Sequence, residues 1–156
     1  MIPHKVKAVL DLYGLTPLEF EPGSTPTSEM AAQRIGVEVA QIAKSILLAG
    51  KDGVFRMAVL RGDRKLASGK VKKLTGVKHR MATAQEAQEQ TGFRIGGVCP
   101  FGLNGIQVLI DQGLGEYERI YPAAGTDASG VPMHIQDLVR ISQGQVCDIA
   151  QEVSLE

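Results

Sequence analysis

The stretch Ser45-Ile46-Leu47-Leu48-Ala49-Gly50-Lys51-Asp52-Gly53-Val54-Phe55-Arg56-Met57-Ala58-Val59-Leu60 decides how this chain folds. It holds two largely apolar runs, 45–49 and 54–60, each of the length of a buried strand. Asp52-Gly53 between them is a strong signal for a hairpin turn, because glycine adopts the positive φ that such turns need. We therefore predict a β-hairpin with strands at 45–49 and 54–60.

Helical and loop signals precede this hairpin. Apolar residues at helical spacing predict a first helix over 3–14, which Gly14 ends. An extended piece is expected at 16–21, and a loop rich in Pro, Gly, Ser and Thr at 22–27. Ser28 to Gly36 has the pattern of a capped helix that ends at a glycine. A further helical turn at 38–43 leads into the hairpin.

The second half of the chain alternates between the two types of element. Ser68 is expected to cap a helix that Gly76 closes, and Thr83 a helix over 84–91, with Glu86 at capping-box spacing. Further strands are predicted at 77–81, 106–111, 119–123, 131–135 and 146–149, and a helix at 136–141. Because no regular βαβ repeat appears, we expect a mixed α/β fold with a curved mixed sheet, in one domain over 1–156.

Composition sets the class of protein. The chain has 156 residues, 44% of them hydrophobic and 22% charged, which is typical of a soluble globular protein. No apolar stretch approaches the roughly 20 residues of a membrane span, and Met1-Ile2-Pro3-His4-Lys5 does not resemble the start of a signal peptide. Two cysteines, Cys99 and Cys147, lack metal-ligand spacing. We expect a cytoplasmic, reduced protein that does not insert into membranes.

The charge is unevenly distributed, although 17 basic and 17 acidic residues give a net charge of zero. Residues 61–80 carry a charge of +7, which leaves −7 on the rest of the chain. Their eight basic residues, against the single acid Asp63, are Arg61, Arg64, Lys65, Lys70, Lys72, Lys73, Lys78 and Arg80. A local basic field of this kind attracts phosphate. The alternative is an ordinary solvated helix face flanked by turns.

Gly96-Gly97-Val98-Cys99-Pro100-Phe101-Gly102 holds three glycines and a proline in seven residues. Such a loop turns tightly and brings backbone N–H groups close to a ligand, because glycine reaches positive φ and proline fixes φ. Lys44 is a lone lysine between two apolar runs. A peptide-lined pocket with one fixed cation suits a polar, partly anionic ligand such as the terminus of a nucleic acid. The alternative for Lys44 is a surface position at a helix–strand junction.

Several common catalytic signatures are missing from the sequence. There is no phosphate-binding loop ending in Gly-Lys-Ser/Thr, no Gly-x-Ser-x-Gly elbow, and no metal-like spacing of the three histidines. Cys99 could be a nucleophile, but a single cysteine without a histidine partner is more often a small buried hydrophobe. A triad drawn from Asp127, Ser129, His134 and Asp137 has nothing in the sequence to fix its geometry.

Taken in order, several segments resemble the YbaK / prolyl-tRNA-synthetase-associated editing-domain family. These segments are 42–47 (IAKSIL), 58–63 (AVLRGD), 91–93 (TGF), 96–102 (GGVCPFG) and 120–125 (IYPAAG). The resemblance extends from about residue 5 to residue 150. It implies a mixed sheet with flanking helices, and neither a metal nor another cofactor.

The resemblance also implies an activity and a site. Members of that family hydrolyse the ester of aminoacyl-tRNAs that carry the wrong amino acid, and a chain this short resembles the free-standing members. The family's invariant lysine corresponds to Lys44 and its Gly-x-x-x-Pro loop to Gly96, Gly97, Val98, Cys99 and Pro100. The implied partner is the acceptor end of an aminoacyl-tRNA of the proline type, and neither DNA nor a membrane. An aminoacyl-tRNA synthetase is a second partner that the resemblance leaves open.

Further binding residues are expected in two segments. Ala123, Ala124 and Gly125 are small enough to line an amino-acid pocket, or simply to pack the end of a strand. Family members often have a serine in this stretch, where this chain has alanine. Lys70, Lys72 and Lys73 of the basic segment are expected to contact the acceptor arm.

Two other functions compete with a trans-editing deacylase. One is a non-catalytic tRNA- or synthetase-binding module of the same fold. The other is a small-molecule hydrolase that acts on free amino-acid esters. The sequence does not determine which amino acid is removed or from which tRNA.

Overall fold

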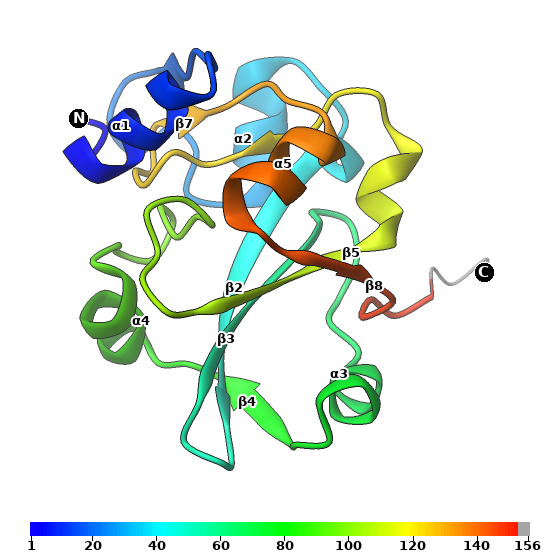
Figure 1. Ribbon diagram of the computed structural model, residues 1–156. Coiled ribbons are helices and arrows are strands. Elements are labelled where there is room, and N and C mark those ends of the chain that lie inside the picture. Colours follow the sequence, from blue (N-terminus) through cyan, green and yellow to red (C-terminus); the bar gives the residue numbers. More distant parts are fainter. Residues whose placement is uncertain (153–156) are drawn as a thin grey trace.

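A long antiparallel hairpin of β2 (Ile42–Gly50) and β3 (Phe55–Arg61) runs through the middle of the molecule (Figure 1). The computed structural model describes residues 1–152. Gly53 has a φ of 81° at the turn, and its N–H donates to the Gly50 carbonyl at 2.9 Å. The predicted hairpin is confirmed, although β2 begins three residues earlier than expected.

The hairpin is the centre of a six-stranded mixed sheet with strand order β4-β2-β3-β5-β8, in which β6 also pairs with β2. β4 is antiparallel to β2, whereas β5, β6 and β8 join in parallel. Two short strands, β1 and β7, form a separate antiparallel pair. The remaining strands are β1 Leu18–Glu19, β4 His79–Met81, β5 Gln107–Asp111, β6 Tyr121–Pro122, β7 Ser129–Gly130 and β8 Gln145–Cys147. The mixed α/β fold is confirmed.

Residues 1–152 form five α-helices, which surround this sheet. They are α1 His4–Leu12, α2 Ser28–Ile35, α3 Ser68–Thr75, α4 Ala84–Thr91 and α5 Ile135–Ser142. The capping box of α4 forms as predicted, with Thr83 accepting from the Glu86 N–H and the Glu86 carboxylate accepting from the Thr83 N–H. Gly36 and Gly76 end α2 and α3 in the left-handed conformation. None of the described helices has the length and apolar character to cross a membrane.

Several sequence-based predictions of local structure were wrong. Thr27 caps α2 in place of Ser28, and Ala67 precedes α3, so that both serines are first helical residues. The turn at 38–43 is only a 3₁₀ helix, η1 (Val39–Gln41). A second 3₁₀ helix, η2 (Gln112–Glu116), was not predicted.

The predicted strand at 131–135 does not form as a ladder. Val131 and Met133 are buried, and their N–H groups donate to the Pro122 and Ile120 carbonyls at 2.8 and 3.0 Å. An isolated antiparallel bridge joins Ile120 and Met133, so the alternating apolar pattern marks a buried segment that is paired too briefly to form a regular strand. α5 begins directly afterwards, at Ile135.

The two faces of the sheet carry separate cores, as strand alternation requires. Met57 and Val59 pack with α1, α4 and the glycine-proline loop in the larger core. Ala58 packs with Leu48, Leu109 and Val71 of α3 in the smaller one. α4 and α3 accordingly lie on opposite sides of the hairpin (Figure 1).

Candidate functional site

The outer edge of β2 has a gap between its two short neighbours. β6 pairs with Ile42 and Ala43, and β4 pairs with 48–50. Within residues 1–152, no strand pairs with 44–46 on this edge, and the Leu47 carbonyl accepts from the Ala82 N–H at 2.9 Å. Lys44 and Ser45 therefore lie where the sheet is interrupted, next to the loops that cross this edge.

A pocket of about 180 Å³ opens beside this gap. Its walls come from four separate parts of the chain: residues 25–28 with the start of α2, β2 at 42–45, the glycine loop at 95–98, and the segment after β6 with Ser129. Lys44, Gly96, Val98 and Ala123 all line it. Four predicted site residues that lie far apart in the sequence are thus brought together.

The glycine loop presents backbone to this pocket. Gly96 has a φ of 92°, which favours glycine, and the Gly97 N–H closes a turn onto the Arg94 carbonyl at 2.9 Å. Within residues 1–152, neither the Gly96 nor the Val98 N–H has a backbone hydrogen-bond partner. Because both residues line the pocket, the loop can offer these donors to a ligand.

Gly97 supports the loop from behind and does not line the pocket. A Cβ at this position would lie 2.9 Å from the C and O atoms of Gly125 and from the Cα of Thr126. Gly125 itself has a φ of 86° and would clash with Pro3 if it carried a Cβ. The loop can approach Gly125 and Thr126 this closely because residue 97 has no Cβ, and the positive φ of Gly125 and its contact with Pro3 require glycine there as well.

Lys44 is half-buried and has no close anionic partner. Its Nζ donates one long hydrogen bond, 3.5 Å, to the Gly62 carbonyl, and no carboxylate of residues 1–152 forms an ion pair with it. Burial lowers the pKa of Lys44, while the charges of Glu29 and Asp63 oppose this shift. The ammonium can therefore gain contacts from an anionic or polar ligand.

Hydroxyl groups also line the pocket, and of these only Ser129 was considered for the site from the sequence, as part of a triad. The Ser45 Oγ is buried without a hydrogen-bond partner in the described residues. Thr25 accepts from the Ser129 N–H at 3.1 Å and ties the 22–27 loop to β7. Ser45 follows Lys44 directly, so its place next to the lysine was available as a signal, whereas Thr25 and Ser129 are brought in only by tertiary contacts.

Cys99 and Pro100 are buried behind the loop and do not reach the pocket. Cys99 belongs to the larger core, and its Sγ lies 4.0 Å from the Phe101 carbonyl. Burial raises the pKa of this thiol to about 12. A neutral, enclosed thiol is a poor nucleophile, and the position fits the buried-hydrophobe interpretation.

Ala123, Ala124 and Gly125 divide between two roles. Ala123 lines the pocket. Ala124 is fully buried, and its N–H donates to the Ser129 Oγ at 3.0 Å. Gly125 faces a different hollow behind the glycine loop. Of the three, the structure brings only Ala123 to the same pocket as Lys44.

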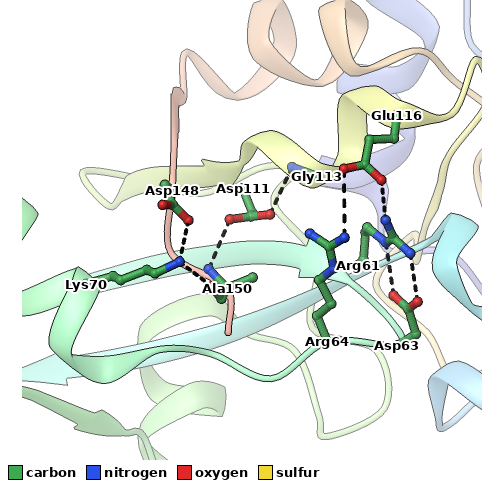
Figure 2. A network of polar contacts seen from close by, with 9 residues as sticks. All are labelled: Arg61, Asp63, Arg64, Lys70, Asp111, Gly113, Glu116, Asp148 and Ala150. Atoms are coloured by element: carbon green, nitrogen blue, oxygen red, sulfur yellow. Dashed lines mark hydrogen bonds and ion pairs between the residues drawn. The ribbon is translucent and has the colours of Figure 1, made fainter. Parts of the chain in front are cut away.

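The basic segment 61–80 is partly neutralised by internal ion pairs, which involve Arg61, Arg64, Lys70 and Arg80. Figure 2 shows Arg61 between Asp63 and Glu116, with Arg64 reaching the same Glu116 carboxylate. Arg80 pairs with Glu86 at 2.7 Å. The segment is therefore not a uniform basic patch, because part of its formal +7 charge is used in ion pairs within the fold.

The three predicted acceptor-arm lysines differ in the same way. The Lys70 Nζ lies 2.9 Å from both an Asp148 carboxylate oxygen and the Ala150 carbonyl (Figure 2). Lys72 and Lys73 are exposed on α3 and pair with no acid of residues 1–152. None of the three lines the pocket.

The residues considered for a triad are occupied elsewhere. The Ser129 hydroxyl is held by Ala124 and Thr126, and the His134 ring by the Glu118 carbonyl at the start of α5. Asp137 accepts from the His134 N–H. Residues 1–152 contain no cluster of three His, Cys, Asp or Glu side chains that could hold a metal ion.

Comparison of the sequence with protein-family models assigns the region that forms this pocket to a family. Residues 22–141 match the model of the aminoacyl-tRNA editing domain, and this range includes every wall of the pocket. The chain belongs to the aminoacyl-tRNA editing domain family. The family resemblance seen in the sequence is thereby confirmed.

Relatives of this editing domain occur both as short proteins and within synthetases. The uncharacterized protein YwhH of Bacillus subtilis is 38% identical over 129 residues, which cover 82% of each chain. The proline–tRNA ligase of Thermotoga neapolitana is 40% identical over 92 residues, 56% of this chain but only 15% of the ligase. In Thermosipho africanus the corresponding ligase is 33% identical, with 18% of its length matched. This chain thus resembles one part of those ligases.

Solved structures share the whole fold. One described as a candidate trans-editing enzyme for prolyl-tRNA synthetase superposes with a TM-score of 0.86 at 32% identity, covering 97% of this chain and all of the other. A hypothetical protein superposes with a TM-score of 0.88 at 27% identity over 95% of this chain. The arrangement of helices around the mixed sheet is therefore shared with both of these structures.

Proposed function

We propose that this editing domain is a trans-editing hydrolase that cleaves the ester of mischarged aminoacyl-tRNA, with tRNA of the proline type as the favoured substrate. The observation that carries the proposal is the meeting of Lys44 with Gly96 and Val98 in one pocket. The relatives named as proline–tRNA ligases, and the structure described as a candidate trans-editing enzyme, support the choice of tRNA.

The size of the pocket suits the aminoacyl group. Its volume of about 180 Å³ lies below the range of roughly 300–1,000 Å³ that is typical of sites for drug-sized ligands. Ala31, Ala43 and Ala123 keep the walls small and apolar. A small amino-acid side chain can enter such a pocket, and a methylene more or less changes its fit by about 1–3 kcal/mol.

The chemistry assigned to the pocket is positioning and charge stabilisation. Free N–H groups at Gly96 and Val98 can bind the ester carbonyl and stabilise its oxygen as negative charge develops there. The Lys44 ammonium can hold the terminal phosphate or ribose of the tRNA. No Asp, Glu, His or Cys of the described residues lines the pocket. The ribose 2′-OH of the substrate is therefore the proposed aid to proton transfer from the attacking water.

The alternative is a module of the same fold that binds tRNA or a synthetase without hydrolysis. The Gly96 and Val98 N–H groups beside Lys44 favour the catalytic role, because donors that can bind an ester oxygen as it gains negative charge are what hydrolysis needs and binding alone does not.

A panel of mischarged tRNAs tests the proposal directly. Purified protein is incubated with alanyl-, cysteinyl-, seryl- and threonyl-tRNA of the proline type, alongside correctly charged prolyl-tRNA, and loss of the ester is followed. We expect fast hydrolysis of at least one mischarged species and little of prolyl-tRNA. Binding without hydrolysis across the panel would select the non-catalytic module. Equal hydrolysis of free amino-acid esters would select the small-molecule hydrolase.

A further inference from the structure

The glycine loop at 95–98 belongs to no helix or strand and rests on the segment 124–129. A Cβ added at Gly97 would lie 2.9 Å from the Gly125 C and O atoms and from the Thr126 Cα, so the two backbones are in close contact. The loop carries the two N–H groups proposed to bind the ester carbonyl. The positions of these donors therefore depend on how the segment 124–129 is held.

Two hydroxyl groups hold the segment 124–129 together. The Ser129 Oγ accepts from the Ala124 N–H at 3.0 Å and from the Thr126 hydroxyl at 2.9 Å, and it donates to the Thr126 carbonyl at 3.4 Å. The Thr126 Oγ1 in turn accepts from the Ala128 N–H at 3.2 Å. We call Thr126 and Ser129 the hydroxyl pair. Its bonds connect the beginning, the middle and the end of the segment.

Ser129 is also bonded to a second wall of the pocket. Its N–H donates to the Thr25 Oγ1 at 3.1 Å, and the Thr25 hydroxyl lies 3.4 Å from the Ser129 carbonyl, to which it donates. Pro26 follows directly and packs against the glycine loop, because a Cβ added at Gly96 would lie 3.3 Å from the Pro26 Cα. Ser129 thus contacts both of the segments that support the loop.

The Ser129 hydroxyl is fully used inside the protein, although the residue lines the pocket. A hydroxyl has one hydrogen to donate and two lone pairs with which to accept. Ala124 and the Thr126 hydroxyl occupy the lone pairs, and the Thr126 carbonyl receives the hydrogen. Ser129 is only 2% exposed. Its hydroxyl can therefore influence a reaction in the pocket through the backbone that it holds.

We propose that Thr126 and Ser129 are positioning residues, whose hydroxyl pair sets the place of the glycine loop and of its N–H donors. This inference rests on the proposed function. Thr126 does not line the editing pocket, so it acts on the aminoacyl group only through other residues. Loss of its hydroxyl leaves the Ala128 N–H without that acceptor and empties one lone pair of Ser129. The segment then relaxes, and the loop moves with it.

The test compares two substitutions at Thr126 with a matched control elsewhere. Thr126→Val removes the hydroxyl at nearly constant volume, and Thr126→Ser keeps the hydroxyl. Thr75 is the control residue: it is also half-buried, lies outside the pocket, and accepts from the N–H two residues later, that of Val77, at 3.2 Å. Thermal melting, steady-state deacylation and amide NMR spectra of the isotopically labelled full chain are measured for Thr126→Val, Thr126→Ser and Thr75→Val.

We expect Thr126→Val to lower kcat for a mischarged tRNA by about tenfold or more, with much less change in KM, because misplaced donors stabilise the transition state less well. Thr126→Ser should restore kcat. Thr75→Val should melt at a lower temperature but keep the wild-type kcat, because its hydroxyl stabilises only a turn at the end of α3. The amide signals of 96–98 should shift in Thr126→Val and stay in place in the other two variants.

Two results would overturn the proposal. One is a Thr126→Val protein that melts at a lower temperature but keeps the wild-type kcat and unshifted amide signals at 96–98. The other is a Thr126→Ser protein as impaired as Thr126→Val, because the hydroxyl would then not be the cause. If Thr126→Val does not fold, Ser129→Ala decides, since it removes the other hydroxyl of the pair and should give the same loss of kcat and the same shifts.

The NMR measurement separates this inference from the proposed function, because it is made without substrate. Signals at 96–98 that shift in Thr126→Val, in a protein whose wild type hydrolyses no mischarged tRNA, would remove the deacylase and keep the hydroxyl pair as the support of the loop. Wild-type hydrolysis by Thr126→Val with unshifted signals would keep the deacylase and remove the positioning role.

Discussion

Lys44 and Lys70 are both part-buried lysines, but the fold treats their charges in opposite ways. Lys70 has two partners at 2.9 Å, and its hydrogen bond with Asp148 raises the pKa of the ammonium. Lys44 has one carbonyl at 3.5 Å, and burial lowers its pKa. The ammonium of Lys70 thus bonds to Asp148 and Ala150 within the fold. The ammonium of Lys44 lies in a pocket, where most of its hydrogen-bond donors have no partner. A charge kept at such a cost indicates a ligand site.

Replacing each lysine by alanine should separate the two roles most strongly. We expect Lys44→Ala to lower kcat/KM for a mischarged tRNA by about 100-fold or more, which is the scale of losing one charge-stabilising contact in a reaction site. Its thermal midpoint should be unchanged or slightly higher, because a desolvated charge is removed. Lys70→Ala should show the reverse, with near-normal deacylation and a lower midpoint.

Lys44→Arg completes that comparison. The guanidinium keeps the charge, but its larger planar head does not replace a compact ammonium in a small pocket, so activity should remain poor. Deacylation assays and melting curves on the three variants decide the assignment. Near-wild-type turnover of a folded Lys44→Ala protein would show that Lys44 has no part in the reaction.

Gly97→Ala tests the backbone side of the same site. The new Cβ would lie 2.9 Å from backbone atoms of Gly125 and Thr126, so the loop must move away from its support. We expect a loss of about 1–3 kcal/mol of stability and a strong fall in deacylation, because the loop carries the Gly96 and Val98 donors.

Gly69→Ala is the matched control for that substitution. Gly69 lies in α3 without a positive φ, and a Cβ added there would meet only open space. Alanine there should stabilise the helix slightly and leave activity unchanged. Equal behaviour of the two variants, in melting and in turnover, would mean that the close contact at Gly97 has no influence on the site.

What the sequence predicted well was local. The hairpin at 42–61, the capping box of Thr83 and Glu86, and the glycine ends of α2 and α3 depend on neighbouring residues. The pairing of β1 with β7 and the pocket walls at Thr25 and Ser129 depend on segments about 100 residues apart. No local pattern encodes such contacts.

The difference between local and long-range contacts also explains which site residues the sequence predicted. Lys44 and the Gly96–Pro100 loop were singled out from their residue pattern and from the family resemblance, and the structure brings Lys44, Gly96 and Val98 to one pocket. The roles of Gly97, Cys99 and Pro100 behind the loop could not be seen without the third dimension. The +7 charge of 61–80 suggested a basic face, but a charge count does not reveal that acids from elsewhere in the chain, such as Glu116 and Asp148, neutralise part of it.

Lys72 and Lys73 extend the comparison to the surface of α3. They carry no ion pair within residues 1–152, in contrast to Lys70 on the same helix. Lys72→Glu/Lys73→Glu should raise KM for aminoacyl-tRNA several-fold with little effect on turnover at saturation, because phosphate contacts position the substrate. The slope of log K against log salt should also become shallower, by about 0.7–0.9 for each lost contact.

The control for this variant is Lys7→Glu/Lys51→Glu, which reverses two exposed lysines that lie on α1 and on the hairpin turn. Both double variants change the net charge by the same amount. Steady-state deacylation at two ionic strengths compares them. An equal rise in KM for both would reflect overall charge, and α3 would then be an ordinary solvated helix.

Substitution of Cys99 is expected to have the smallest effect on deacylation. It tests whether the reaction proceeds without a thiol. Its thiol lies in the core with a pKa raised to about 12, so it stays protonated between pH 7 and pH 9. Cys99→Ala should keep substantial deacylation and lose about 1 kcal/mol of stability, because a small buried group is deleted. The wild type should react slowly with iodoacetamide over that pH range, since the thiolate is the reactive form. Abolished turnover in a folded Cys99→Ala protein, together with rapid alkylation of the wild type that stops its activity, would instead make Cys99 the nucleophile and reduce Lys44 to a supporting role.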